Sequence, residues 1–237
     1  MSDLFKFKQF EVDQSGCAMK INTDGVLLGA LAGGSQPESI LDIGTGTGVI
    51  AMMMAQRFRD ARIDAVEIDT AAAETAGRNF QNSDFSSRLR VYAMGFNAYF
   101  QTYPERQYDL IISNPPFYIN SLEASTSKKN LAKHTDHNFF EDLIKTAFHR
   151  LTNKGALWLV LPVSTSVLVK SLAVKHQLFV EHQINIHSFA HSDAHREIIL
   201  LNKSQTKPTA RRFIIYDAPK VYSEQYQECL RDFFTIF

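Results

Sequence analysis

From about residue 39 onward, short apolar runs alternate with longer stretches in which apolar residues recur every three or four positions. The short runs are typical of buried strands, and the longer stretches are typical of helices that pack on a sheet. The predicted strands are 39–43, 62–67, 88–93, 108–113, 156–161, 178–186 and 196–202. The predicted helices are 49–57, 70–81, 139–151 and 164–176. This alternation predicts a parallel sheet with helices on both faces, in which the last two strands form a pair.

Three segments depart from this alternation. Residues 1–37 precede the first glycine-rich turn and are too few for a full domain. Residues 115–138 join a buried strand to a helix without clear periodicity, and a connection of that length is often functional. After a polar break, the pattern predicts a strand at 211–216 and a closing helix at 223–234 with Ser223 as its N-cap. We therefore divide the chain into an N-terminal segment (1–37), a core domain (38–203) and a C-terminal extension (204–237).

The composition is that of a globular protein and excludes several classes. Of the 237 residues, 45% are hydrophobic and 21% charged, and 25 basic side chains balance 25 acidic ones. A neutral balance argues against a histone-like coat for nucleic acid but leaves room for a local basic patch. The first eight residues are interrupted by charges, unlike a signal peptide, and no apolar run approaches the roughly 20 residues of a membrane span. We expect a soluble cytoplasmic protein.

The first chemical motif lies between the predicted strand 39–43 and the following helix. Gly44, Gly46 and Gly48 form a GxGxG pattern, which differs from the GxGxxG of dinucleotide sites. Glycines there permit a tight turn and let a ligand approach bare backbone, while the helix N-terminus favours a carboxylate or phosphate. Asp42 would repel a pyrophosphate but would attract an ammonium group. The motif therefore favours an amino-acid-like ligand.

A second motif, Glu67 followed by Ile68, closes the next predicted strand. Glu67 lies 23 residues after Gly44. An acid at about this distance in a nucleotide-binding α/β unit accepts hydrogen bonds from ribose hydroxyls. The ligand predicted by the two motifs together has both an amino-acid part and a nucleoside part.

The third motif is Asn114-Pro115-Pro116-Phe117, directly after the strand 108–113. In an open α/β sheet, ligands bind at the carboxyl ends of the strands. The prolines fix the backbone and remove N–H donors, so the local carbonyls face outward without a competing donor. The Asn114 side chain adds a second acceptor oxygen. Two adjacent acceptors can hold both hydrogens of a planar NH2 group, and Phe117 can stack on a flat base.

Neither the histidines nor the cysteines predict a metal site. His187, His191 and His195 recur every four residues, but their surroundings predict strand, turn and strand, not one helix face. Cys17 and Cys229 lie far apart with no CxxC spacing, which argues against a disulfide scaffold or a thiolate zinc site. We expect both thiols to be buried or inert.

The three motifs together resemble class I S-adenosylmethionine-dependent methyltransferases that carry an NPP[FY] signature and methylate planar amino or amide nitrogens. The resemblance implies a Rossmann-like fold with a seven-stranded, mostly parallel sheet, an antiparallel C-terminal strand and helices on both faces. Three further stretches, 19–30, 128–134 and 216–237, resemble the bacterial tRNA1(Val) adenine N6-methyltransferase family. That family implies methyl transfer from S-adenosylmethionine to N6 of adenine 37 in the tRNA anticodon loop, without a metal.

The resemblance also implies roles for individual residues. Thr23 and Asp24, in the N-terminal segment that closes over the cofactor, would cover its methionine end. The remaining cofactor contacts would come from Asp42, Gly44, Thr45, Gly46, Gly48, Glu67, Ile68, Asn97 and Asn114. Asn114, Pro115 and Phe117 would hold the target base as the catalytic residues. Gly95 stands where related enzymes place an acid that contacts the cofactor adenine, so Asn97 or backbone would have to replace it.

Two basic clusters are the predicted tRNA-binding residues. One lies in the long connection after the NPPF motif and comprises Lys128, Lys129, Lys133 and His134. The other lies in the C-terminal extension and comprises Arg211 and Arg212. Phosphate contacts of this kind make RNA binding depend on salt concentration.

Other functions remain open at this level. A protein methyltransferase acting on a glutamine amide uses the same NPP chemistry, although such relatives carry a larger N-terminal helical domain. Another RNA base amino group is a further possible acceptor. The third hypothesis is a protein without catalytic activity, a module that binds RNA or the cofactor. The intact NPPF motif argues against it.

Overall fold

The fold is built around one nine-stranded sheet. The computed structural model describes residues 3–34, 36–116 and 126–237, and for 126–136 it describes the backbone alone. The strand order is β11-β10-β8-β9-β7-β6-β3-β4-β5. The strands of this sheet are β3 (Ser39–Ile43), β4 (Arg62–Glu67), β5 (Leu89–Ala93), β6 (Tyr108–Ser113), β7 (Leu151–Pro162), β8 (Phe179–Phe189), β9 (Ala194–Asn202), β10 (Thr209–Ala218) and β11 (Val221–Tyr222). A separate hairpin pairs β1 (Leu4–Lys6) with β2 (Glu11–Asp13).

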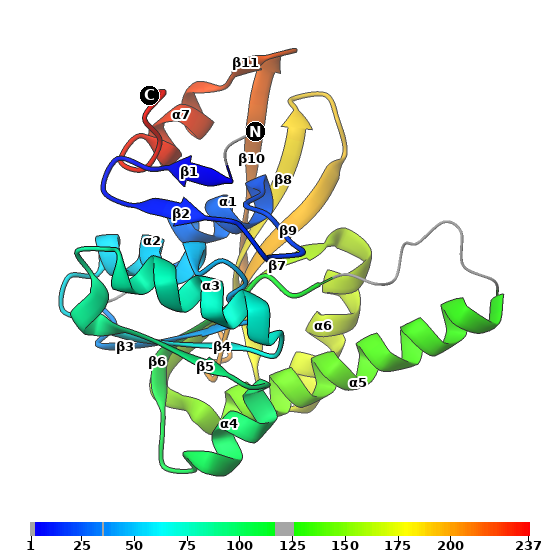
Figure 1. The fold of residues 1–237 in the computed structure, drawn as a ribbon. Helices are drawn as coiled ribbons and strands as arrows, with labels where there is room; N and C mark the ends of the chain where they lie inside the picture. Colours follow the sequence, from blue (N-terminus) through cyan, green and yellow to red (C-terminus); the bar gives the residue numbers. More distant parts are fainter. Residues whose placement is uncertain (1–2, 35, 117–125) are drawn as a thin grey trace.

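Helices cover both faces of the sheet (Figure 1). They are α1 (Thr23–Leu31), α2 (Val49–Arg57), α3 (Thr70–Gln81), α4 (Phe96–Thr102), α5 (Thr126–Arg150), α6 (Val163–Lys175) and α7 (Glu224–Leu230). One apolar core holds the buried side of α1, α2, α3 and α7, and a second core holds α4, α5 and α6. Among the described residues, no helix combines the length and the apolar character needed to cross a bilayer.

The direction of the strands decides where a ligand can bind. Strands β5, β4, β3, β6 and β7 run parallel to one another, and β9 runs antiparallel between β7 and β8. Strand β10 is parallel to β8. The carboxyl ends of all the strands except β9 and the short β11 therefore lie along one edge of the sheet, together with the start of β9. We call this the site edge.

The sequence predictions for this core are largely confirmed. Strands β3, β4 and β6 and helices α2 and α3 have the predicted bounds, and β8 and β9 pair as expected. Ser223 caps α7, accepting a hydrogen bond from the backbone N–H of Tyr226 at 3.1 Å. The mostly parallel sheet with an antiparallel strand is confirmed, because apolar strands that alternate with helices have both faces covered.

Other predictions were incomplete. The sheet has nine strands instead of seven, because β10 and β11 extend it beyond β8. Helix α5 begins at Thr126, well before residue 139, and α4 was not predicted. The segment 1–37 contains a hairpin and α1, which lack a long periodic pattern of their own. Such elements form through tertiary packing, which overrides weak local preference.

The N-terminal hairpin packs on the C-terminus of the chain. Phe7 forms an isolated antiparallel bridge with Phe234, and the Lys8 amide donates to the carbonyl of Phe233 at 2.8 Å. The ring centroids of Phe7 and Phe234 lie 5.7 Å apart. The two ends of the sequence therefore stabilise each other over the helical layer that contains α1 and α2.

We expect Gly48→Ala to destabilise the fold by about 2–5 kcal/mol. Gly48 begins α2 with φ +84°, and an added Cβ would lie 2.5 Å from the Phe80 ring. Left-handed strain and overpacking act together at this position. Urea unfolding measures the loss, with Gly34→Ala as the control, since no atom lies within 4 Å of a Cβ at Gly34. Equal stability of the two variants would contradict this account of the turn.

Candidate active site

The β3–α2 turn presents bare backbone at the site edge. Gly44, Gly46 and Gly48 have φ values of +71°, +55° and +84°, which side-chain-bearing residues rarely adopt. A Cβ on Gly44 or Gly46 would meet no atom within 4 Å, so both residues face open space. Gly48 closes the turn by donating its amide to the carbonyl of Thr45 at 2.9 Å. The backbone here is shaped for close approach by a ligand.

Asp42 is a fully buried carboxylate beside this turn. Its Oδ2 accepts a hydrogen bond from the Thr45 hydroxyl at 2.6 Å, while Oδ1 has no hydrogen-bond partner. Burial raises the pKa of Asp42 from 3.8 to about 7, against the opposing hydrogen bond from Thr45. A buried acceptor without a partner is costly. Asp42 is therefore a site where a positively charged group would bind well.

Glu67 and Ile68 form the next part of the site edge, at the end of β4. Glu67 Oε2 accepts the Gly46 amide at 2.9 Å, and Oε1 accepts the Asp69 amide at 2.9 Å. The carboxylate is thereby fixed between the glycine turn and the start of α3. Ile68 is 79% exposed, and its Cδ1 lies 3.6 Å from a Cβ built on Gly95. This exposed apolar side chain offers a surface beside Gly95 on which a flat ring could pack.

The start of α1 lies against the end of β6. Asn22 caps the helix by accepting the Gly25 amide at 2.9 Å. A Cβ on Gly25 would be 3.5 Å from Asn114 Nδ2, so the Asn114 amide lies against the first turn of α1. Asp24, in the same turn, accepts a hydrogen bond from Arg196 Nε at 2.7 Å. Residues that are about 90 and 170 positions apart in sequence therefore meet around the first turn of α1.

The end of β6 is held in place before the NPPF motif begins. The buried Ser113 hydroxyl donates to the carbonyl of Ile43 at 2.8 Å, which ties β6 to the end of β3. Asn114 is half-buried and Pro115 is buried. Phe117 lies outside the described residues. Ser113 thus connects the asparagine directly to the strand that precedes the glycine turn.

The structure brings together most of the described cofactor residues that the sequence predicted. Asn97 is the exception. Asn97 lies in α4, and its Nδ2 donates to Asp142 Oδ2 of α5 at 3.5 Å. Asn97 also lines a shallow groove between α4 and α5, with Phe100 and Lys145 among its neighbours. Its side chain therefore faces α5, and the geometry supports backbone near Gly95 as the adenine contact better than it supports Asn97.

The predicted tRNA-binding residues fall in two places. Lys128, Lys129, Lys133 and His134 belong to the first turns of α5, where side chains are not described. Arg211 and Arg212 are exposed on β10. Arg212 Nη2 donates to the carbonyl of Ala190 at 2.7 Å, so this side chain also supports the turn between β8 and β9.

Sequence reasoning missed Ser113, Gly25 and Arg196. Ser113 ends the strand directly before the third motif, and nothing in the sequence indicates a role for it. Arg196 pairs with a residue 172 positions away. Only the pairing of β9 with β7 brings it to the site edge, where Arg196 is the register partner of Pro162.

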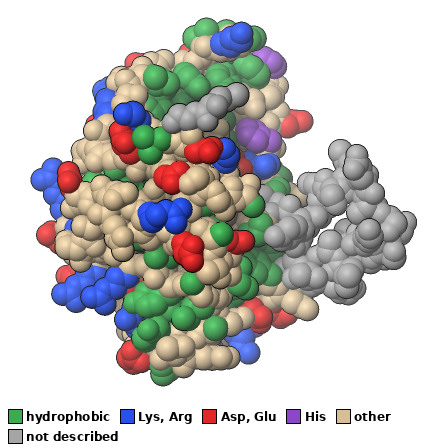
Figure 2. Space-filling model, viewed as in Figure 1, with side chains coloured by type: hydrophobic (Ala, Val, Ile, Leu, Met, Phe, Trp, Pro, Cys, Tyr) green, Lys and Arg blue, Asp and Glu red, His purple; other side chains and the backbone are tan. Residues whose placement is uncertain are grey.

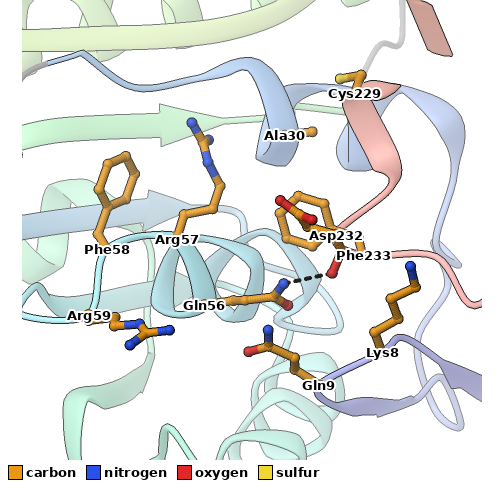
Figure 3. A pocket seen from close by; sticks show the side chains of 10 residues that line it. All are labelled: Lys8, Gln9, Ala30, Gln56, Arg57, Phe58, Arg59, Cys229, Asp232 and Phe233. Atoms are coloured by element: carbon orange, nitrogen blue, oxygen red, sulfur yellow. Dashed lines mark hydrogen bonds between the residues drawn. The ribbon is translucent and has the colours of Figure 1, made fainter. Parts of the chain in front are cut away.

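A second hollow of about 600 Å³ lies at the other end of α2 (Figure 3). Gln56 points across it and donates to the carbonyl of Asp232 at 2.8 Å. The Arg57 side chain donates to the carbonyl of Gly29 at 2.8 Å, and Lys8 to that of Phe237 at 2.9 Å. Burial raises the pKa of the Cys229 thiol at its rim to about 11. Its polar groups join the chain ends to α1 and α2, and we assign this hollow a structural role.

Comparison with known proteins gives the class. Residues 22–182 match the family model described as "Methyltransferase small domain". The fold is similar to the crystal structure of a predicted O-methyltransferase from Agrobacterium tumefaciens, with a TM-score of 0.69 and 21% identity, covering 89% of this chain and 96% of that one. A methyltransferase from Pyrococcus furiosus aligns with a TM-score of 0.53 and 23% identity, over 80% of this chain and 90% of that one. The class is therefore a Rossmann-like methyltransferase.

Full-length relatives give the particular family. The tRNA1(Val) (adenine(37)-N6)-methyltransferase of Pedobacter heparinus is 44% identical over 237 residues, covering 100% of both chains. The enzyme of the same name from Christiangramia forsetii is 40% identical and covers 97% of both chains. The chain belongs to the family of bacterial tRNA1(Val) (adenine(37)-N6)-methyltransferases. The resemblance derived from the sequence motifs is thereby confirmed.

The cofactor of this class is S-adenosylmethionine, and the residues present fit it. Its ammonium group suits the partnerless Oδ1 of the buried Asp42. Its amino-acid part suits the open backbone at Gly44 and Gly46. Its ribose suits the fixed carboxylate of Glu67, and its flat adenine suits the exposed wall of Ile68.

We expect Arg196→Ala to weaken S-adenosylmethionine binding about three- to tenfold. The substitution removes the partner of Asp24 and loosens the first turn of α1 beside Asn114. The pair is partly exposed, so its loss corresponds to about 1 kcal/mol. Calorimetric titration measures the affinity, with the exposed Arg62→Ala at the opposite edge of the sheet as the control. Unchanged affinity would mean that the ion pair does not order this part of the site.

Proposed function

We propose that this chain transfers a methyl group from S-adenosylmethionine to the N6 amino group of adenine 37 in the anticodon loop of tRNA1(Val). One observation carries the proposal: Asn114 and Pro115 follow β6 at the point where the first turn of α1 and the end of β3 meet. Family membership supports the substrate, since the full-length relatives bear the name of this reaction.

The chemistry requires alignment more than a base. The bound cofactor supplies a methyl group that is already activated by a positively charged sulfur. The adenine amino nitrogen is a poor nucleophile because its lone pair is delocalised into the ring. In our proposal, the Asn114 Oδ1 and the Pro115 carbonyl accept its two hydrogens. This arrangement turns the lone pair out of the ring plane toward the methyl group. Positioning of this kind is worth roughly 7–11 kcal/mol of the barrier.

Proton release needs no dedicated side chain in this scheme. As the new nitrogen–carbon bond forms, the bond between the methyl carbon and sulfur breaks and the sulfur leaves as a neutral thioether. The positive charge passes to the nitrogen, which becomes acidic. The proton can leave through the carbonyl acceptors to water. The residues of the chain therefore hold and desolvate the amine, and the Pro115–Pro116 peptide helps because it has no N–H to compete for the carbonyl.

The geometry of the site edge supports a set of cofactor contacts that we propose. We assign the ammonium group to Asp42 and Thr45, and the amino-acid backbone to Gly44, Gly46 and Gly48. Glu67 accepts from the ribose hydroxyls, and Ile68 covers the adenine. Thr23 and Asp24 close over the methionine end. Phe117 stacks on the target base.

The RNA partner is an anticodon stem-loop. An adenine in an unpaired loop is easier to unstack and insert into a pocket than a paired one. We assign phosphate contacts to Lys128, Lys129, Lys133, His134, Arg211 and Arg212. A tRNA-modifying enzyme of this kind works in the cytoplasm, where its substrate is.

Transfer of labelled methyl groups to unmodified tRNA1(Val) tests the function. Label in N6-methyladenosine, absent when adenine 37 is replaced by guanine, is the expected result. Label found only in protein would overturn the proposal and favour a glutamine amide as acceptor. Label in another modified nucleoside would overturn the assigned base while retaining RNA methylation.

A further inference from the structure

The hairpin between β8 and β9 reaches the site edge at Ala190–Asp193, and we call residues 189–195 the hairpin tip. Strand β8 ends and β9 begins there, and β9 pairs with the end of β7 through Arg196 and Pro162. Strands lie about 4.8 Å apart, so the three spacings from β8 to β6 amount to about 14 Å across the sheet. The register places Ser113 of β6 level with Gln183 of β8, and Phe189 lies about 20 Å further along the strand direction, so the tip is roughly 25 Å from the end of β6. A few nucleotides span that distance.

The tip has a defined shape. The Phe189 amide donates to Ser192 Oγ at 3.0 Å, and the Ser192 amide donates to the Phe189 carbonyl at 3.0 Å. His187 Nδ1 lies 2.7 Å from the Ser192 carbonyl, and Arg212 Nε lies 3.3 Å from His187 Nε2. Since a carbonyl only accepts and a guanidinium only donates, His187 is the neutral tautomer with its proton on Nδ1. Both of its nitrogens are used, so its role is to hold the turn.

The tip presents planar side chains. His191 is exposed, and its ring stacks on Phe189 with centroids 5.6 Å apart and planes inclined by 13°. Phe189 lies 5.8 Å from the ring of Tyr216 at the end of β10, and Tyr216 stacks on Tyr222 at 5.2 Å. A row of rings therefore runs along the site edge away from Asn114.

Positive charge accompanies this row. The guanidinium of Arg212 contacts the tip through the Ala190 carbonyl. Arg211 precedes it in β10, so its side chain lies on the opposite face of the sheet, where it interacts with Cys229. Histidine and Lys or Arg side chains gather at the upper right of Figure 2, over the region where this hairpin ends in Figure 1. Asp193 is an acidic residue of the tip and is exposed.

Contacts between side chains connect the tip with the active site. Arg196 follows the tip on β9 and binds Asp24, and the adjacent Gly25 lies against Asn114. These contacts link the base of the tip to the position assigned to the target base. Rings together with cations are the usual means of binding unpaired nucleotides, because every base has a face on which to stack.

We propose that the hairpin tip binds unpaired nucleotides of the same RNA loop, several positions from the target adenine, with one base stacked on His191. This inference rests on the proposed function and adds to it the path of the loop beyond the active site. Phe189 stacks on the other side of His191, and Arg212 neutralises nearby phosphates. The rings are planar and exposed at one end of the row, which suits a base better than a folded protein surface.

His191→Ala tests the stacking contact with an anticodon stem-loop RNA. We expect KM and Kd for the RNA to rise about five- to twentyfold with kcat and cofactor affinity unchanged. His191→Phe keeps a flat ring and should retain most of the affinity. The control is His182→Ala, an exposed histidine of β8 that contacts Thr209 Oγ1 at the opposite edge. Unaltered KM and Kd in His191→Ala would overturn the inference.

Asp193→Asn tests the same surface through an expected gain in RNA affinity. Removal of a negative charge should raise RNA affinity about two- to threefold at low salt, with the difference lost at high salt. An unchanged affinity at low salt would count against RNA at the tip. If the wild-type protein methylates adenine 37 and the tip variants behave like it, the inference fails while the proposed function stands. If the wild-type protein does not methylate RNA, the proposed function fails first.

Discussion

Asn114→Ala is expected to reduce kcat by about 10³-fold or more while S-adenosylmethionine still binds within a fewfold of the wild-type affinity. The alanine removes one of the two acceptors that hold the amine, and the lone pair of the nitrogen then stays in the ring plane. Loss of a single preorganised polar contact typically costs about 10²–10³ in kcat, and lost alignment adds to that. The effect falls on the chemical step because Asn114 acts on the acceptor amine.

Two further variants make this prediction specific. Asn114→Asp keeps an acceptor oxygen in the same place and should retain more activity than Asn114→Ala. Asn153→Ala replaces an exposed asparagine at the far end of β7 and should leave kcat unchanged. Single-turnover measurements with labelled cofactor separate the chemical step from product release. If Asn114→Ala raised only the RNA KM, the residue would bind the base without aligning it.

Asp42→Asn is expected to weaken S-adenosylmethionine binding about 10- to 100-fold. The amide keeps the shape of the side chain and can still accept from the Thr45 hydroxyl, but it removes the charge that faces the ammonium group. Hydrogen bonds to charged groups contribute about 1.5–3 kcal/mol, which gives this range. Calorimetric titration measures the loss, and Asp60→Asn on an exposed turn is the control.

The same substitution should stabilise the ligand-free protein at neutral and higher pH. Burial raises the pKa of Asp42 from 3.8 to about 7, so between these values the folded state binds a proton that the unfolded state does not. The contribution of Asp42 to the free energy of unfolding of the wild type therefore falls as the pH rises from about 4 to 7 and is level above that range. The Asp42→Asn variant does not lose stability in this way, because the amide does not ionise.

Thermal unfolding without cofactor at pH 5 and pH 8 shows whether Asp42→Asn is more or less stable than the wild type at each pH. At pH 8 we expect the Tm of Asp42→Asn to exceed that of the wild type by about 2–6 °C, with a smaller difference at pH 5. Added S-adenosylmethionine should reverse the order, because it stabilises the wild type more. A difference independent of pH would show that Asp42 is not a buried acid with a raised pKa.

The motifs on consecutive strand ends were readable because each uses neighbouring residues. The glycine pattern at 44–48 requires three left-handed backbones, and Glu67 closes the next strand. Asn114-Pro115 follows a strand whose apolar run is unmistakable. The parallel topology then places all of these strand ends on one edge, so the proposed cofactor and base sites could be predicted from local pattern and strand direction.

Other parts of the site had no local signature. Arg196 and Asp24 meet only because β9 enters the sheet antiparallel beside β7. The three histidines show a spacing of four that would lie on one helix face, whereas the structure places them on a hairpin where His187 holds the turn and His191 is exposed. Asn97 was the nearest polar residue to the missing acid in sequence, yet its side chain faces α5.

The sequence by itself determined the class of fold, the family and the cofactor, and it supplied the residues that we propose to hold the reacting amine, because these depend on backbone conformations and apolar periodicities that neighbouring residues impose. The tertiary structure alone decided which distant side chains support them. It brought the start of α1 against Asn114, attached Arg196 to Asp24, and extended the sheet so that the hairpin tip reaches the site edge. The physical reason is that pairing between strands and burial of shared apolar surface act between residues far apart in the chain, and no local pattern records them.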